Sequence, residues 1–396
     1  MSTLPNVVIT HAVRTPIGKF LGGFSKLSAA DLGTQCVQAL LARSGVSPEK
    51  VDRVYLGVGR QAGGGPNPAR QVTVRAGIPH KTPAMTVNMA CASGLKAITL
   101  GADAIALGQA RFVVAGGAES MTNLPFLLPR MRQGYRLGHE KVVDAMYQDG
   151  FLCPLSKMLM GETAEKLARE MSIARAEQDA FALASQQKCE AARKAGRFED
   201  EIAPVKVPGD RGGETVISAD EHPRDGATLE SLAKLPPVFD AKTGTVSAGN
   251  SSGITDGAAA VLLCSEEDAR RAGLPILARI GAATEAGVDP SIMGIGPVPA
   301  IRALSERTGY GVDGFDLIEL NEAFAAQVIA CDRDLKFPGD RLNVNGGAIA
   351  LGHPIGATGC RIVVTLLHEM RRRNAKRGLA TLCVSGGMGV ALELVR

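Results

Sequence analysis

The predicted elements in the last third of the chain repeat the order of those in the first third. In the first third the pattern predicts a helix, two strands, a small-residue helix and a strand, at 30–44, 54–57, 84–88, 92–107 and 112–115. In the last third it predicts the same order, at 299–308, 317–320, 342–345, 354–372 and 379–384. In both copies Val-Asn precedes the central helix and Gly-Gly follows the last strand. We therefore predict two similar α/β halves packed into one layered body.

The segment 121–247, between the two halves, has a different character. It contains arginine-rich loops, a long polar helix over about 174–195 with Gly196 at the expected C-cap, and an irregular stretch over 208–226. We interpret it as an inserted lid or substrate-binding subdomain. The first half then resumes with a strand and a helix, at 256–265 and 266–272. We expect a first half, an inserted loop domain and a second half, at 1–120 plus 248–273, 121–247 and 274–396.

Composition excludes several classes of protein. The chain has 396 residues, which is enough to bury a full hydrophobic core. It contains 47 glycines, whereas average usage would give about 28. They gather at 57–65, 346–359 and 386–389, where we expect backbone to pass close to a ligand. A net charge of +4 and an aromatic content of 4% do not suit a nucleic-acid surface, so we expect no nucleic-acid partner.

The sequence indicates a reducing compartment. It lacks the basic and apolar runs of a signal peptide, and no uninterrupted apolar stretch approaches the ~18 residues of a membrane helix. Its last four residues are not a peroxisomal address. We therefore expect a soluble, cytoplasmic protein without a membrane span. The eight cysteines include no C-x-x-C pair, because the two closest, Cys360 and Cys383, are 23 positions apart. This spacing predicts free thiols and no metal site.

The motif from Gly57 to Ala62 resembles a dinucleotide-binding fingerprint. It follows a strand and matches G-x-G-x-x-A, but it runs into three further glycines and a proline instead of a helix. The acidic residue that would bind the ribose is missing, since no Asp or Glu occurs over 53–102. The sequence therefore does not favour a dehydrogenase.

A second motif resembles the nucleophile elbow of serine hydrolases. Ser251 lies in Gly-Asn-Ser-Ser-Gly, which matches G-x-S-x-G, and Asp256 and His353 follow in hydrolase order. The residues after the motif predict a strand, where a hydrolase requires a helix. A serine hydrolase stays open as a minor alternative.

Cys91 lies at the junction between a predicted strand and the predicted helix 92–107. A thiol at a helix N-terminus has its pKa lowered by free N–H groups and the helix dipole, and the thiolate is the reactive nucleophile. The acid-free stretch 53–102 carries six Lys and Arg residues, which add positive potential. Free cysteines are also common as small buried side chains. Position alone therefore leaves a nucleophilic and a structural role for Cys91 both open.

His353 occupies the matching place in the second half. It precedes a predicted helix whose first residue would be Pro354, a residue favoured at that position. If the halves pack about a pseudo-twofold axis, the two helix N-termini converge and bring a thiol next to an imidazole, the pair that activates a sulfur nucleophile. A loop histidine bonded to backbone is the alternative. Cys383 ends the last predicted strand and could equally be a structural thiol, as we expect for Cys264 and Cys360.

Six motifs together resemble the thiolase family, and they occur in the family's order from one end of the chain to the other. They are Val13–Gly18 (VRTPIG), the stretch around Cys91 (NMACASGL), Ala248–Gly253 (AGNSSG), Asn321–Phe324 (NEAF), Gly352–Gly356 (GHPIG) and Cys383–Gly389 (CVSGGMG). The resemblance implies an α/β fold with five layers, α-β-α-β-α, built from two pseudo-symmetric halves with a loop domain inserted in the first.

The resemblance also implies roles for individual residues. Cys91 would carry the acyl group as a thioester, His353 would activate the thiols of Cys91 and coenzyme A, and Cys383 would move the proton at the α-carbon. One oxyanion hole would use His353 and a water held by Asn321, and the other the backbone N–H groups of Cys91 and Ser385. Ser385 stands where the family often has glycine, so a side chain enters the site there.

Coenzyme A contacts follow from the same resemblance. They fall on residues of the inserted segment and of both halves, namely Arg224, Ser231, Phe239, Ala248, Ser252, Met293 and Phe324. The insertion would thus cover coenzyme A. Leu159 stands where short-chain biosynthetic members carry histidine, which argues against strict specificity for acetoacetyl-CoA.

We therefore expect an acyl-CoA:acetyl-CoA C-acyltransferase of lipid and fatty acid metabolism that works by a ping-pong mechanism. Coenzyme A would be a substrate, and we expect no cofactor and no metal. The family implies a homodimer or homotetramer. Decarboxylating relatives pair their cysteine with two histidines, whereas the third group here is Cys383. A thiolase-like acyl-CoA or lipid carrier that does not condense is a further alternative.

Overall fold

The computed structural model describes residues 5–209 and 212–396, so the first four residues of the expected first half lie outside the described part. One sheet runs through the protein. Its strands are β1 (Val7–Arg14), β2 (Gly18–Lys19), β3 (Arg53–Gly57), β4 (Ala84–Val87), β5 (Phe112–Ser120), β10 (Thr255–Ser265), β11 (Ala278–Gly287), β12 (Leu317–Leu320), β13 (Arg377–Val384) and β14 (Met388–Val395). They follow the order β12-β13-β14-β11-β1-β10-β5-β3-β4, with β2 paired to β10. The two halves of the sheet meet where β1 pairs with β11.

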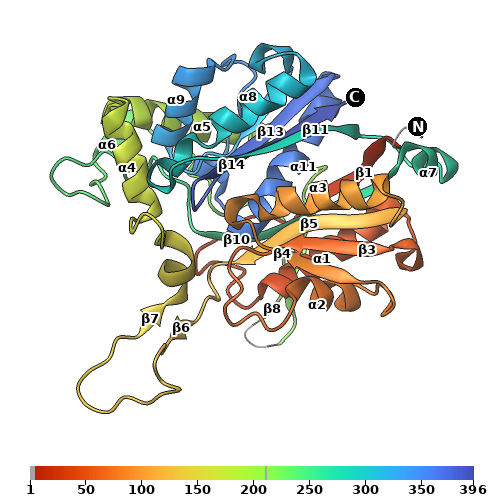
Figure 1. The fold of residues 1–396 in the computed structure, drawn as a ribbon, viewed down its shortest axis with the longest axis horizontal. Helices are drawn as coiled ribbons and strands as arrows, with labels where there is room; N and C mark the ends of the chain where they lie inside the picture. Colours follow the sequence, from red (N-terminus) through yellow and green to blue (C-terminus); the bar gives the residue numbers. More distant parts are fainter. Residues whose placement is uncertain (1–4, 210–211) are drawn as a thin grey trace.

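Helices cover both outer faces of the sheet halves and fill the space between them (Figure 1). They are α1 (Ala29–Ser44), α2 (Pro68–Arg75), α3 (Ser93–Ala106), α8 (Pro297–Thr308), α9 (Ala325–Leu335) and α11 (Ile355–Arg373). From bottom to top, Figure 1 shows α1 and α2, the first half-sheet, α3 and α11, the second half-sheet, and α8 and α9. Apolar residues of α3 and α11 form one buried cluster with strands of both halves. The expected five-layered fold is confirmed.

The central helices approach each other closely because glycine stands at their contacts. A Cβ at Gly94 on α3 would lie 2.8 Å from the backbone nitrogen of Cys360 on α11. A Cβ at Gly359 would lie 2.5 Å from the backbone nitrogen of Leu95. We expected the glycines of 346–359 to make room for a ligand, and several of them instead make room for neighbouring backbone. Backbone packed at this distance holds the two helix N-termini together.

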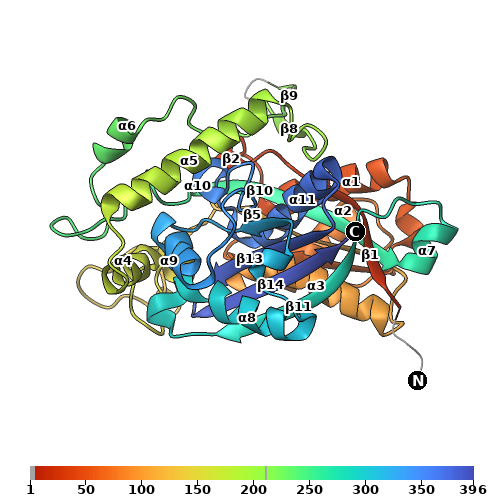
Figure 2. The same ribbon diagram turned by 90° about the horizontal axis from the view of Figure 1, so that it is seen from above.

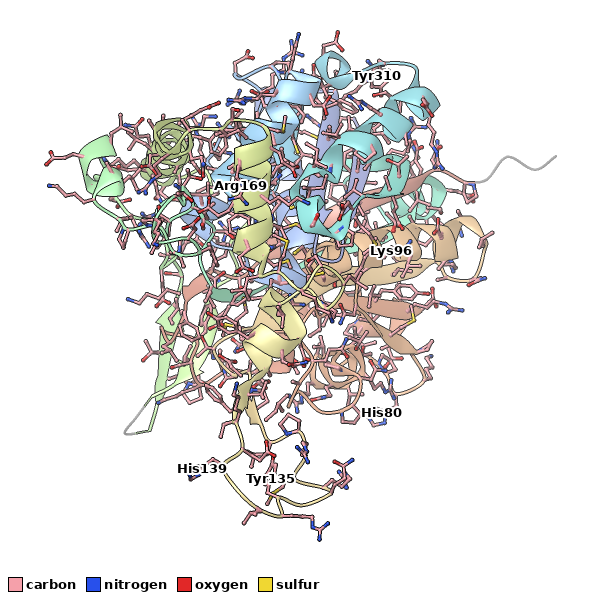
Figure 3. The ribbon with its side chains drawn as sticks, turned by 60° about the vertical axis from the view of Figure 1, so that its left-hand side comes forward. His80, Lys96, Tyr135, His139, Arg169 and Tyr310 are labelled. Carbon is pink, nitrogen blue, oxygen red and sulfur yellow. The ribbon has the colours of Figure 1, made fainter. Side chains whose placement is uncertain are left out.

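The inserted segment forms an arm and a helical cap. Its elements are β6 (Phe126–Leu127), β7 (Val143–Asp144), a short π-helix (Tyr147–Phe151), α4 (Met160–Glu170), α5 (Arg175–Lys194), β8 (Val205–Pro208), β9 (Glu214–Ile217) and α6 (Leu229–Ala233). Figure 2 shows α4, α5 and α6 gathered on one side of the body. The arm carries β6 and β7 and extends away from it, with Tyr135 and His139 near its end (Figure 3).

Two local predictions are wrong. The strand expected over 342–345 is reduced to a single bridge between Leu342 and Ile318, because Asn343 has a φ of +44° and its side chain takes the place of further backbone pairing. Its Oδ1 accepts from the Leu320 amide at 2.9 Å and its Nδ2 donates to the Leu320 carbonyl at 2.8 Å. Pro354 is not the first helical residue but the N-cap of α11, because its ψ of 92° is extended. The predicted order also lacks two helices, α2 between β3 and β4 and α9 after β12, together with the strands β1, β11 and β14.

Candidate active site

Cys91 lies in a tight turn between β4 and α3. The preceding residue, Ala90, has a φ of +45°, a strained conformation for a residue other than glycine. Ser93 holds this turn, since its Oγ accepts from the Met89 amide at 2.9 Å and donates to the Ala90 carbonyl at 2.6 Å. The turn presents the half-buried Cys91 thiol to the second half of the molecule.

His353 meets that thiol from the other half. Its Nε2 lies 3.3 Å from Cys91 Sγ, across 262 positions of sequence. Its Nδ1 lies 2.7 Å from Thr358 Oγ1, which in turn lies 3.0 Å from the Pro354 carbonyl. The single hydroxyl hydrogen of Thr358 bonds to that carbonyl, so the hydroxyl oxygen accepts from an Nδ1–H. Nε2 is then unprotonated and can accept the thiol proton. Thr358 is not among the predicted site residues, although its position one turn into α11 places it next to His353.

Burial disfavours the charged form of both groups, so the expectation that Cys91 has a lowered pKa is wrong. Burial raises the pKa of Cys91 more than the charge of Arg60 and the backbone N–H groups of Ser385 and Cys91 lower it. Burial also lowers the pKa of His353 to about 3, with the charges of Arg361 and Arg60 adding to the effect. Desolvation outweighs the helix N-terminus because it disfavours the charged form of each group.

Of the remaining predicted catalytic groups, Cys383 and the backbone of Ser385 lie beside the Cys91 sulfur. Cys383 ends β13 and is buried, and burial raises its pKa well above the ordinary value, with the nearby Cys91 adding to the rise. The backbone N–H groups of Ser385 and Cys91, the expected second pair of oxyanion donors, both face Cys91 Sγ. Asn321 is fully buried, and in the described part of the chain neither atom of its side-chain amide has a hydrogen-bond partner. A buried amide in this state is suited to hold a water or a ligand.

A cavity of about 570 Å³ opens above these groups. Six of the seven residues expected to contact coenzyme A line it together with the reactive side chains, namely Arg224, Phe239, Ala248, Ser252, Met293 and Phe324. The seventh, Ser231, does not line it. Its hydroxyl is exposed on α6 and donates to the Thr228 carbonyl at 2.8 Å. Leu159, the N-cap of α4, also lines the cavity.

Glu119, which sequence analysis missed, joins loops from both halves beneath the cavity. Its carboxylate accepts from the amides of Gly59, Arg60 and Gly356 at 2.9, 3.2 and 2.8 Å. Burial raises its pKa to about 7, and the charge of Arg60 and these three bonds oppose the rise. Because Gly356 belongs to the first turn of α11, Glu119 ties the loop after β3 to the helix that carries Thr358.

The arrangement does not assemble a serine hydrolase triad. The Ser251 hydroxyl donates to the Ser247 carbonyl at 2.8 Å. Asp256 accepts from the amide and hydroxyl of Thr122, and His353 faces Cys91 and Thr358. The motif at Gly57 leads into a loop, and the next helix, α2, starts only at Pro68.

Three general features of the described residues bear on function. Within 5–209 and 212–396 no group of three or more His, Cys, Asp or Glu side chains is placed to hold a metal ion. No helix in those same ranges has both the length and the apolar character needed to cross a membrane. All eight cysteines are free thiols.

Family models match almost the whole chain. The model described as "Thiolase, N-terminal domain" matches residues 7–267, and "Thiolase, C-terminal domain" matches residues 274–396. The acetyl-CoA acetyltransferase of Pseudomonas aeruginosa is 53% identical over 393 residues, which cover 99% of this chain and 100% of that protein. A probable acetyl-CoA acetyltransferase of Escherichia coli is 51% identical with the same coverage.

Solved structures agree with these matches. The crystal structure of the Bacillus anthracis acetyl-CoA acetyltransferase superposes with a TM-score of 0.97 at 44% identity, over all of both chains. Human mitochondrial 3-ketoacyl-CoA thiolase gives a TM-score of 0.95 at 42% identity, again over all of both chains. The same human enzyme in complex with CoA also gives 0.95 at 42%, over all of this chain and 99% of that one.

Proposed function

Since this chain belongs to the thiolase family, we propose that it cleaves 3-oxoacyl-CoA with coenzyme A, and runs the reverse condensation, through a thioester on Cys91. The observation that carries this proposal is the 3.3 Å contact between Cys91 Sγ and His353 Nε2, in a cavity that also holds Cys383. A thiol beside an acceptor imidazole is the arrangement for covalent catalysis by sulfur.

In the first half-reaction His353 Nε2 takes the Cys91 proton as the sulfur attacks the 3-oxo carbon. The bond between C2 and C3 then breaks, and its electron pair goes to C2. The Cys383 thiol gives its proton to C2, which releases acetyl-CoA and leaves the acyl group on Cys91. The raised pKa of Cys383 keeps it a thiol, ready to donate. The imidazolium proton then restores the Cys383 thiol.

In the second half-reaction coenzyme A takes the acyl group from Cys91. His353, neutral again, accepts the proton of the coenzyme A thiol, whose sulfur attacks the thioester carbon. The bond to Cys91 breaks, and the proton on His353 returns to the Cys91 sulfur. One histidine thus serves both thiols in turn.

Two sets of donors stabilise the oxyanions in this scheme. The backbone N–H groups of Cys91 and Ser385 face the nucleophile and suit the thioester oxygen. Asn321, with its unpartnered buried amide, suits a water that, with His353, binds the enolate oxygen. A donor of this kind contributes about 10²–10³ in kcat.

Coenzyme A occupies the cavity bounded by Phe239, Met293 and Phe324, with Arg224 at its exposed end. The human structural relative, which was crystallised with CoA, supports this assignment. We also propose that no cofactor or metal takes part, because His353 and Cys383 account for every proton transfer above. Activity should then be unchanged after treatment with a chelator.

We propose further that the protein acts on lipid-derived thioesters in the cytoplasm as a homodimer or homotetramer. The free state of all eight cysteines supports a reducing compartment. The arm supports assembly, because apolar side chains are exposed along it, namely Phe126, Leu128, Met131, Leu137 and Val142. Light scattering on the purified chain tests the proposed assembly, and a monomer at micromolar concentration would refute that assembly.

Mass spectrometry after incubation with acetyl-CoA tests the central proposal. We expect an increase of one acetyl group, confined to the peptide with Cys91, and its loss on adding coenzyme A. Cys91→Ala should abolish both the adduct and turnover. Saturable acyl-CoA binding without thiolysis would instead favour an acyl-CoA carrier. An esterase activity that is lost in Ser251→Ala would favour a serine hydrolase.

A further inference from the structure

Arg60 is a buried cation at the end of the cavity where Cys91 lies. It follows β3, is 7% exposed, and lines the cavity. Three apolar side chains of the same wall, Met121, Phe151 and Ile355, pack with Cys91 in one cluster. The other Lys and Arg side chains of the cavity wall, Lys19 and Arg224, are exposed. An acyl group on Cys91 therefore meets an apolar wall that contains one buried guanidinium.

The hydrogen-bond partners of the Arg60 guanidinium are both neutral. One terminal nitrogen donates to the Gly59 carbonyl and the other to the Gly150 carbonyl, both at 3.1 Å. Its Nε has no hydrogen-bond partner among the described residues. Gly150 leaves room for the group, because a Cβ there would lie 2.5 Å from Nε. Two of the five N–H bonds of the guanidinium are thus used.

No carboxylate neutralises this charge directly. Within the described part of the chain, no acidic oxygen lies within 4.0 Å of the Arg60 side-chain nitrogens. Glu119 interacts with the charge of Arg60 without forming an ion pair with it, because its carboxylate accepts from three backbone amides, including that of Arg60 itself. Buried guanidinium groups are normally paired with carboxylate or phosphate, and an unpaired buried charge is costly. The cavity therefore holds a binding group that an anion would complete.

We propose that Arg60 binds a carboxylate at the far end of the acyl chain, so that the enzyme prefers thioesters of short dicarboxylic acids. The inference rests on the proposed function, because it is the acyl group on Cys91 that carries the carboxylate to Arg60. The methylenes of the chain lie against Met121, Phe151 and Ile355, and the carboxylate accepts from the free N–H groups of the guanidinium. Arginine suits this contact because its planar fork matches the two oxygens of a carboxylate.

A second role for Arg60 would leave a different signature. Its positive charge also acts on Cys91 and His353, and lowers the pKa of both. If that were its whole contribution, removing the charge would slow acylation by every thioester to the same extent. Loss of a carboxylate contact adds a further decrease in rate only for the thioesters that carry a carboxylate. The comparison between two acyl groups of equal length separates the roles.

The experiment compares succinyl-CoA with butyryl-CoA, which have four-carbon acyl groups with and without a terminal carboxylate. The rate of acylation of Cys91 is measured by mass spectrometry for the wild type, Arg60→Met and Arg60→Lys. We expect the wild type to react faster with succinyl-CoA. Arg60→Met should lose about 10- to 100-fold more rate with succinyl-CoA than with butyryl-CoA, as expected for a charge-assisted hydrogen bond. Arg60→Lys should recover part of the loss.

Arg271→Met serves as the matched control. It removes an exposed arginine paired with Glu267 on the surface helix α7 (Glu266–Arg271), and both rates should stay unchanged. The inference is overturned if wild type does not prefer succinyl-CoA, or if Arg60→Met slows both thioesters equally. Failure of the proposed function looks different, since no thioester, acetyl-CoA included, would then acylate Cys91. The preference of the wild type is informative even if Arg60→Met does not fold.

Discussion

The hydroxyl of Thr358 lies 2.7 Å from Nδ1 of His353, and this contact determines which imidazole nitrogen faces Cys91. The hydroxyl donates to the Pro354 carbonyl one turn earlier, so it accepts from the imidazole. The N-terminal turn of α11 therefore presents His353 as a proton acceptor. A residue that contacts no substrate thus prepares the proposed base.

Replacing Thr358 by valine should lower kcat by about 10- to 100-fold, part of the contribution of a general base. Valine keeps the shape but cannot accept the Nδ1–H, so the ring loses its preferred tautomer. An unpartnered buried donor should also cost about 1–3 kcal/mol of unfolding free energy. Single-turnover acylation by acetyl-CoA measures the first effect. Thr358→Ser should restore the rate, and a valine variant with wild-type kcat would contradict the assignment.

Cys91 should become reactive only at alkaline pH in the free enzyme. Burial raises the pKa of Cys91 and lowers that of His353 to about 3, so neither is charged near neutrality. The rate of inactivation by iodoacetamide, followed from pH 5 to 10, should therefore keep rising above pH 8. A plateau beginning near pH 6 would show a thiolate–imidazolium pair and contradict this prediction. Protection by saturating acetyl-CoA would show that the modified thiol is the one in the cavity.

Glu119 should make stability depend on pH. Its pKa in the folded protein is raised from 4.5 to about 7, so between these values the folded state binds more protons than the unfolded state. The contribution of Glu119 to the free energy of unfolding is complete below pH 4.5. It falls by up to about 3 kcal/mol as the pH rises to 7. Urea denaturation from pH 5 to 8 should show this fall for wild type and a flatter profile for Glu119→Gln. Parallel profiles would contradict it.

Cys383→Ala should separate acyl transfer to Cys91 from proton transfer at the α-carbon. Acetylation of Cys91 by acetyl-CoA needs only His353, so it should persist within about tenfold of the wild-type rate. Exchange of the methyl protons of acetyl-CoA with deuterated water needs the proposed base at the α-carbon, so it should fall at least about 100-fold. Proton NMR in deuterated buffer measures the exchange. Retained exchange in the variant would remove Cys383 from its proposed role.

Gly161→Ala should weaken coenzyme A binding. A Cβ at position 161 would overlap the ring of Phe239, which lines the cavity. Alanine is otherwise favoured in a helix by about 1 kcal/mol, so α4 should keep its structure. We expect KM for coenzyme A to rise about tenfold with a smaller change in kcat. Gly339→Ala is the control, because nothing lies within 4 Å of the Cβ it would add, and an equal effect of both variants would refute the prediction.

The sequence predicts the repeated halves and the convergence of Cys91 and His353, because each half places its reactive residue before a central helix. Local pattern is sufficient there, since helix starts and strand ends leave recognisable residues. It fails at Asn343, whose side chain replaces the pairing of a strand. It also misses Glu119, whose partners at 59, 60 and 356 come together only in the folded chain.

The residue pattern was sufficient to predict the repeat of the two halves, the family resemblance and the set of reactive side chains. The protonation of these side chains depends on how the chain packs. By sequence Cys91 has a helix N-terminus and basic neighbours, which favour a thiolate, but the packed halves bury it against His353 and raise its pKa. The tertiary structure also placed Arg60 in the wall beside Cys91 without a carboxylate partner. Burial depends on atoms brought together from distant parts of the chain, and the order of residues does not record it.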